Sequence, residues 1–147
     1  MKLYKLPVQA RAATGWSHMA HFKVADGDLT TVNQIQDVCP IPVGSIVGKA
    51  AFFTKTAWAT ITTPIVDVGI AATGVTGDTL LDGASCATAN NTTYGGTNAL
   101  HFTVNNTAAR FVTIKQLGSG SSATAGEGFL FFTLVDCTTL VNDPATF

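Results

Sequence analysis

Short apolar segments separated by turn residues run along this whole chain, and they constrain its fold more than any other feature. Stretches such as 18–25, 45–54 and 65–72 are short apolar strand candidates, and apolar residues alternate loosely with polar ones over 29–39. A period of two is typical of β-strands, and no long window shows the i, i+3, i+4, i+7 recurrence of an amphipathic helix. The spacing of turn signals predicts about eight antiparallel strands, arranged as a β-sandwich, a jelly roll or a small barrel.

Three later stretches refine this prediction. Residues 100–104 and 111–116 alternate on either side of an Asn-Asn-Thr turn, so they predict a hairpin. The polar run 85–98 is rich in Asn and Thr, and we interpret it as a long surface loop. Residues 129–136 are apolar at almost every position, which is typical of a strand buried between two layers.

The first 16 residues stand outside the strand pattern. They carry Lys2, Lys5 and Arg11 with no acidic residue, and Pro7 interrupts them. We expect residues 1–16 to be an extended N-terminal arm that orders on a neighbour, followed by a single domain over 17–147. The alternative is a frayed terminus or a first edge strand. The residues expected to contact a partner are those of the arm and two tryptophans: Lys2, Leu3, Tyr4, Lys5, Leu6, Arg11, Trp16 and Trp58.

Charged residues are scarce for a chain that is to remain alone in water. Only 12% of the residues are charged, and 23 threonines stand against 8 Lys plus Arg. A weakly charged, Thr-rich β surface favours a subunit that packs against neighbours. The net charge of −1 argues against nucleic-acid or anionic-membrane binding. No apolar run approaches the length of about 18 residues that a membrane helix needs.

The chain offers little that resembles a catalytic or metal centre. Cys39, Cys86 and Cys137 are odd in number and far apart, so we expect free thiols without bound metal. His18 and His21 are three residues apart and point to opposite faces of a strand, which disfavours a shared metal ion. Acidic pairs such as 26/28 and 78/82 fit turn chemistry better than calcium binding. We therefore expect neither enzymatic activity nor a cofactor.

The order of several fragments resembles a family of virion proteins. Phe22–Thr30 contains an Asp-Gly-Asp turn, and a Pro-x-Pro-x-Gly step at 40–44 leads into a strand that ends in Ala-Ala-Phe-Phe-Thr54. Val-Asp-Val-Gly at 66–69, Leu-Asp-Gly at 81–83 and Ala-Gly-Glu-Gly at 125–128 follow. Together these fragments, over about residues 20–136, resemble the jelly-roll decoration (cement) proteins of tailed-bacteriophage capsids. The arm, the 85–98 loop and the Gly69-Ile70 step depart from the pattern of that family.

This resemblance implies a jelly-roll-like β-sandwich that decorates and stabilises a tailed-phage capsid by bridging capsid subunits. It implies a homotrimer on the outer surface of the virion, bound to the major capsid protein and made in the host bacterial cytoplasm. The alternative is a carbohydrate- or receptor-binding β module of a phage tail or fibre. In that case, exposed tryptophans near the 85–98 loop would stack on a sugar.

Overall fold

A computed structural model describes residues 1–7, 15–42, 45–72, 80–95, 102–104 and 110–136 of the chain. In this part the fold is almost entirely strand, with one short 3-10 turn, η1 (Val24–Asp26). None of the described segments is a helix long and apolar enough to cross a membrane.

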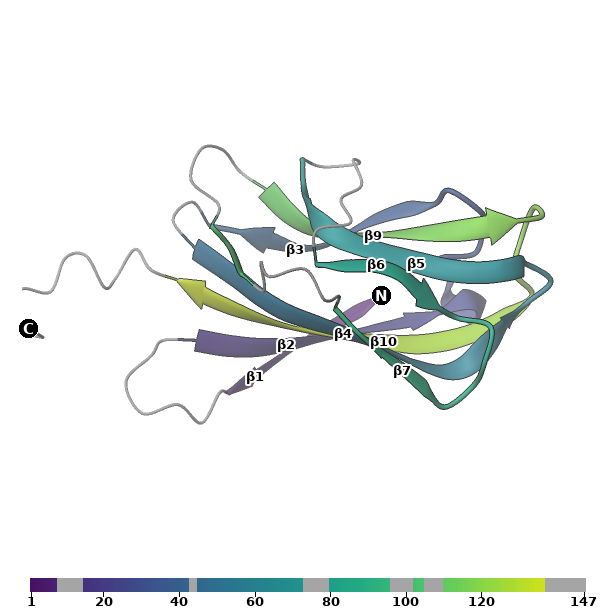
Figure 1. The fold of residues 1–147 in the computed structure, drawn as a ribbon, viewed down its shortest axis with the longest axis horizontal. Helices are drawn as coiled ribbons and strands as arrows, with labels where there is room; N and C mark the ends of the chain where they lie inside the picture. Colours follow the sequence, from purple (N-terminus) through teal and green to yellow (C-terminus); the bar gives the residue numbers. More distant parts are fainter. Residues whose placement is uncertain (8–14, 43–44, 73–79, 96–101, 105–109, 137–147) are drawn as a thin grey trace, which may run out of the picture.

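The strands form two antiparallel sheets that face each other as two layers (Figure 1). The six-stranded sheet contains, in spatial order, β1 (Lys2–Pro7), β2 (Gly15–Lys23), β10 (Ala125–Asp136), β4 (Ser45–Ala59) and β7 (Asn91–Tyr94), with β8 (Phe102–Val104) also paired to β4. The four-stranded sheet contains β3 (Ile35–Ile41), β9 (Arg110–Ser119), β5 (Thr62–Ala71) and β6 (Leu81–Ser85) in that order. The predicted all-β sandwich is therefore confirmed.

The strand count and two segment assignments differ from the sequence prediction. The described residues form ten strands, where about eight were expected for the chain. Residues Asn91–Tyr94, predicted to lie in a surface loop, form β7 because they pair with residues 51–54 of β4. Residues 1–16 were expected to be an extended arm, with a frayed terminus or a first edge strand as the alternative. In the structure, Lys2–Pro7 form an edge strand that pairs with β2. Residues 8–14 lie outside the described part.

Prolines lie in these strands at positions that need no ladder hydrogen bond. Pro40 belongs to β3, which is an edge strand of its sheet. Pro64 lies within β5 at a register irregularity between Thr62 and Ile65. Proline lacks a backbone N–H and is tolerated in sheets at edges and bulges. Neither proline therefore breaks the sandwich.

The core lies between the two sheets and follows the two-residue alternation of the sequence. On β10, Leu130 and Phe132 face the other sheet and are 0% and 2% exposed. From the opposite layer, Val66 of β5 and Ile114 of β9 are both fully buried. Phe22 of β2 completes the apolar layer against Phe52, with ring centroids 6.4 Å apart. Successive side chains of a strand point to opposite faces, so one face of each sheet builds the core.

The other face of β10 departs from the prediction for residues 129–136. We expected this strand to be buried on both faces, and it is indeed central in its sheet. Its outward residues, however, are only partly covered: Phe129 is half-buried and Phe131 is 39% exposed. In the described part of the chain the second layer lies on one side of the sheet only (Figure 1). Nothing in the described part of the chain therefore accounts for the apolar character of this outward face.

Neighbouring residues of β10 give a direct test of this arrangement. Leu130→Ala should lower the free energy of unfolding by about 2–5 kcal/mol, because it removes buried methyl groups and leaves a cavity. Phe131→Ala should cost clearly less, because its ring already contacts solvent. Urea unfolding of the two variants measures both values. Equal losses at the two positions would contradict the assignment of inner and outer faces.

Candidate interaction surface

The structure brings most of the predicted partner-binding residues together at one edge of the six-stranded sheet. Lys2, Leu3, Tyr4, Lys5 and Leu6 all belong to β1. Trp16 lies near the start of β2 and pairs through its backbone with Pro7. β1 is the terminal strand of its sheet, so one side of its backbone has no strand partner among the described residues. Arg11 lies outside the described residues.

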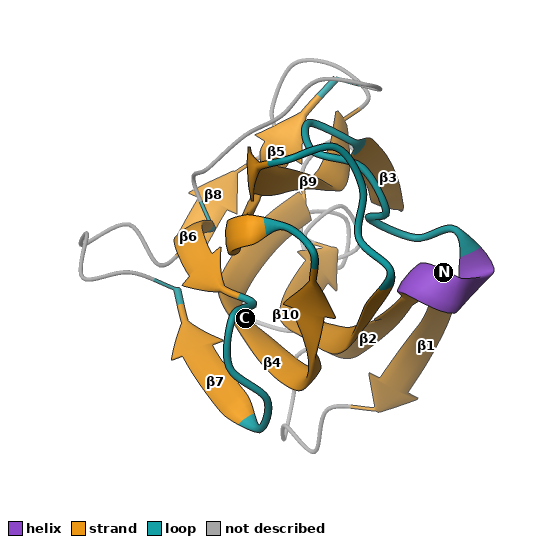
Figure 2. Cartoon of the chain, turned by 90° about the vertical axis from the view of Figure 1, so that its right-hand side faces the viewer, coloured by secondary structure: helices purple, strands orange, loops and turns teal. Residues whose placement is uncertain are grey.

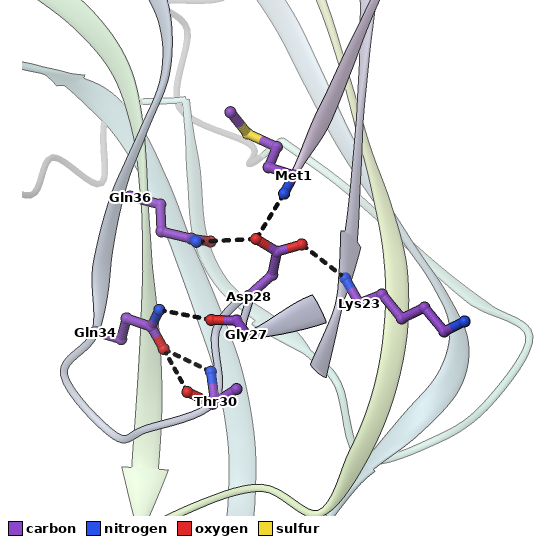
Figure 3. Close-up of polar contacts among 7 residues, drawn as sticks. All are labelled: Met1, Lys23, Gly27, Asp28, Thr30, Gln34 and Gln36. Carbon is purple, nitrogen blue, oxygen red and sulfur yellow. Dashed lines mark hydrogen bonds and ion pairs between the residues drawn. The ribbon is translucent and has the colours of Figure 1, made fainter. Parts of the chain in front are cut away.

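A buried carboxylate attaches the beginning of β1 to the body of the sandwich. Asp28 is only 4% exposed, and its Oδ1 lies 2.7 Å from the amino group of Met1. The same carboxylate accepts hydrogen bonds from the Lys23 backbone N–H and the Gln36 side-chain amide (Figure 3). A buried charge needs such partners, because its hydration is lost. Asp28 therefore links β1, β2 and β3.

The loop after Asp28 is closed by a second set of polar contacts. Gln34 accepts hydrogen bonds from the backbone N–H groups of Thr30 and Thr31, at 2.6 and 3.1 Å. Its amide donates to the Gly27 carbonyl at 3.1 Å (Figure 3). Gly27 has φ of 86°, a left-handed conformation that glycine adopts without strain. The turn predicted at residues 26–28 is therefore present, and it holds Asp28 in place. Figure 2 shows the amino terminus beside η1, at this corner of the molecule.

Trp58 requires a correction. It was expected to contact a partner, yet its side chain is 3% exposed. Its Nε1–H donates to the Leu29 carbonyl at 3.2 Å, and its ring packs 6.0 Å from that of Phe52. A buried tryptophan with a satisfied N–H is a core residue. Trp58 therefore presents no surface to a partner.

A row of stacked rings crosses the outward face of the six-stranded sheet. His21 on β2 stacks on Phe129 of β10 with centroids 4.6 Å apart and planes 8° apart. Phe53 on β4 lies on the other side of Phe129, at 6.3 Å. In the next row, Phe131 is 39% exposed, and Tyr94 of β7 is 75% exposed. The sequence disfavoured a shared metal site for His18 and His21, and the two do lie on opposite faces: His18 is buried against Phe132.

An ion-pair cluster borders this row. The Oε1 atom of Glu127, on β10, lies 2.9 Å from His21 Nε2 and 3.0 Å from Lys55 Nζ. The hydrogen bond from Lys55 lowers the pKa of Glu127 below its ordinary value near 4.5, and His21 acts in the same direction. Glu127 therefore remains a carboxylate at neutral pH and fixes the ring of His21 over Phe129.

The sequence analysis did not select His21, Phe53, Phe129 or Phe131 as interaction residues. The signal was present in the last strand, whose apolar residues occupy both faces. It was interpreted as burial between two layers, because alternation cannot distinguish a second layer of the same chain from a partner. The stacking across β2, β10 and β4 depends on strand order, which joins residues far apart in the sequence.

Chemically reactive groups are few among the described residues. Cys39 and Cys86 are both buried, and burial raises the pKa of Cys86 to about 12. The thiolate is the reactive form, so Cys86 is inert in the folded protein. Cys137 lies outside the described residues. In the part of the chain that the structure covers, no group of three or more His, Cys, Asp or Glu side chains could hold a metal ion.

Comparison of the sequence with protein-family models gives no match, and comparison with curated proteins gives none either. Comparison of the structure with solved structures does give matches. The fold is similar to a chain in the acidic stable capsid structure of Helicobacter pylori bacteriophage KHP30, with a TM-score of 0.55 and 14% identity. This match covers 91% of the present chain and 93% of the other.

Two further capsid structures contain similar chains. One is the capsid asymmetric unit of cyanophage Pam1, with a TM-score of 0.57, 15% identity and coverage of 88% and 89%. The other is the capsid of Ralstonia phage GP4, with a TM-score of 0.54, 15% identity and coverage of 87% and 88%. At this level of identity the comparison shows a shared fold. The chain thus has the fold of chains found in three bacteriophage capsids.

Asp28 offers a test of how firmly β1 is held. Asp28→Ala should lower the free energy of unfolding by about 1–3 kcal/mol, because it leaves buried donors without an acceptor. Asp26→Ala is the matched control, since Asp26 is exposed and two residues away. Urea unfolding of both variants checks the difference. Hydrogen exchange of β1 should rise in the Asp28 variant alone, and unchanged exchange there would contradict the anchoring role.

Glu127 predicts a pH dependence with a defined sign. Its pKa is lowered in the folded state, so its ion pair stabilises the fold above the ordinary carboxyl range and loses this effect as the pH falls. The difference in Tm between the wild type and Glu127→Gln should therefore be largest near neutral pH and shrink on acidification. Thermal unfolding across this range measures it, with the exposed Asp82→Asn as control. A difference that stays constant with pH would contradict the ion pair.

Proposed function

We propose that this chain is a non-enzymatic structural protein of a bacteriophage virion, and that it decorates the outer surface of the capsid. The observation that carries the proposal is the whole-chain similarity to chains from three phage capsids. The matches span nearly all of both partners, so the similar chains are about as long as this one. This similarity along the whole length of the neighbouring chains supports the role of an auxiliary subunit.

The strand order supports a jelly-roll connectivity. β2, β10, β4 and β7 lie side by side in one sheet, opposite β3, β9, β5 and β6 in the other. The chain passes repeatedly from one sheet to the other, as in a sandwich of eight strands built from two Greek keys. On this interpretation β1 and β8 are additions to the eight strands. The jelly-roll-like sandwich is also the architecture that the family resemblance implies.

The proposed role is mechanical and requires no chemistry on a substrate. A subunit that binds across the contacts between capsid subunits stabilises the assembled shell by mass action. Many copies on one particle add their small contributions. The scarcity of charge suits a subunit whose surface is largely covered in the particle. We further propose the major capsid protein as the partner and a homotrimer as the assembled form.

The edge of β1 is the first contact region of this proposal. Lys2–Leu6 lie on the terminal strand of the sheet, and an open strand edge can add a strand from a neighbour. Trp16 lies beside it on β2, and we also assign a contact to Arg11. These residues keep the role that the sequence gave them, now on a strand anchored by Asp28 rather than on a free arm.

The alternative, a carbohydrate- or receptor-binding module of a tail or fibre, has less support. It depended on exposed tryptophans near residues 85–98, and Trp58 is buried in the core. Residues 91–94 of that predicted loop belong to a strand of the sheet. No observation on the described residues favours a sugar platform over a protein contact.

Particles assembled with and without this chain test the function. We expect the chain to be found on the outside of the shell by electron microscopy. We also expect its addition to raise the temperature at which the shell disrupts by several degrees, because it binds only the assembled state. An unrelated small β-sandwich protein at the same concentration is the control. Localisation on the tail, or an unchanged disruption temperature at saturating chain, would refute the decorating role.

A further inference from the structure

The outward face of the six-stranded sheet carries an aromatic patch that no described part of the chain covers. We define the aromatic patch as Met19, His21, Phe53, Tyr94, Phe129 and Phe131. The patch residues come from β2, β10, β4 and β7. His21, Phe129 and Phe53 share one row of the register, and Met19, Phe131 and Tyr94 share the next, with Ala51 between the last two. Phe131 and Tyr94 are 39% and 75% exposed, and the others are half-buried. The rings of His21, Phe129 and Phe53 stack in one row across three strands.

Such a patch is unusual on a soluble monomeric protein. Contiguous apolar surface on a soluble chain marks a contact site or an aggregation risk, whereas single apolar residues do not. Aromatic side chains bury much area at low entropic cost and are frequent anchors of interfaces. The described residues place no further layer over this face. The apolar outward residues of β10 therefore point to a cover supplied by another molecule.

The charges around the patch indicate the chemistry of that molecule. Lys2, Lys23 and Lys55 are exposed on strands of this sheet. Glu127, the acidic group among them, is paired with Lys55 and His21, so Glu127 and Lys55 offset each other and Lys2 and Lys23 supply the positive charge beside the patch. The patch thus has a basic rim and is complementary to an acidic surface.

A second copy of the chain does not fit this face well. Two copies that met through the same face would bring their lysine rims together. A second copy could instead bind the patch through the outer face of its four-stranded sheet. The two sheets lie on opposite sides of the sandwich, so each copy would then contact one neighbour on each side (Figure 1). That contact repeats without closing and leads to an open stack, not to a trimer. The charge and the layer geometry therefore favour a different protein.

We propose that the aromatic patch and its lysine rim form a docking surface for an acidic protein surface with an apolar centre. The inference rests on the proposed function, in which that surface belongs to a capsid subunit. Phe131 is the central anchor, because it is exposed and lies between Met19 and Ala51 in the register. The row of His21, Phe129 and Phe53 is a preformed wall beside it. Lys2 and Lys23 steer and align the partner.

The docking surface is continuous with the β1 edge. Lys2 lies opposite His21 in the strand register, and Tyr4 lies opposite Met19. A partner that pairs with β1 would therefore extend directly onto the patch. The ion pair of Asp28 with Met1 keeps β1 in this register.

Rebinding to particles that were assembled without this chain tests the proposal. Four purified variants are compared with the wild type. Phe131→Ser and the double variant Lys2→Glu/Lys23→Glu alter the patch and its rim. Phe111→Ser and Lys115→Glu make matched changes on β9 of the other sheet, where both residues are half-buried. Thermal unfolding first establishes that each variant is folded at the temperature of the assay.

We expect the wild type to bind with an affinity that falls as salt rises, because exposed charges are screened. Phe131→Ser should weaken binding about tenfold or more, as for the loss of a central anchor. The double lysine variant should weaken it and reduce the salt dependence. The two control variants should bind as the wild type does. This pattern supports the docking surface.

Other outcomes overturn the proposal in distinguishable ways. If the wild type binds and the patch variants bind equally well, the docking surface is wrong while the decorating function stands. If the wild type does not bind the particles at all, both fail. Self-association of the isolated wild type that Phe131→Ser abolishes would identify a second copy as the occupant. Patch-dependent binding on a glycan array, without particle binding, would identify a sugar instead.

Discussion

The sandwich depends on the close approach of two aromatic side chains to β10. A Cβ atom at Gly126 would lie 2.6 Å from Cδ2 of Trp58, and one at Gly128 would lie 2.6 Å from Cζ of Phe52. Only glycine leaves room for both rings at these positions. The rings close one end of the core beneath β10, and the Trp58 N–H bond to Leu29 ties that end to the turn that carries Asp28. The packing of the core and the attachment of β1 therefore meet at one corner.

The same Gly-Glu-Gly segment also builds the outward face. Gly126 and Gly128 face the two rings inside, so the alternation of the strand turns Glu127 outward, toward His21 and Lys55. From there β10 continues with Phe129 and Phe131 outside and Leu130 and Phe132 inside. One central strand thus supplies both the middle of the core and the middle of the aromatic patch. A partner that binds the patch would contact the strand on which the core is organised.

Much of the fold could be predicted from the sequence, because strand alternation and turn residues are local signals. The turn at 26–28, the sandwich and the burial of Leu130 and Phe132 all follow from short stretches. Strand order is a non-local property, so the stacking of His21, Phe129 and Phe53 could not be derived. Trp58 was misassigned for a related reason: its glycine partners lie about 70 residues further along the chain. Composition favoured a subunit that packs against neighbours, but it did not indicate which face would contact them.

The position of β1 shows how one buried carboxylate can order a terminal segment before it meets a partner. The basic, apolar residues 2–6 suggested an arm that orders only on a partner. The bond from the Met1 amino group to Asp28, together with six backbone pairs to β2, orders the segment beforehand. A segment that is already ordered loses less conformational entropy on binding, so the same contacts give a tighter complex. The entropy cost of ordering β1 is then met on folding, and Lys2 is held beside the aromatic patch, where a partner would contact both together.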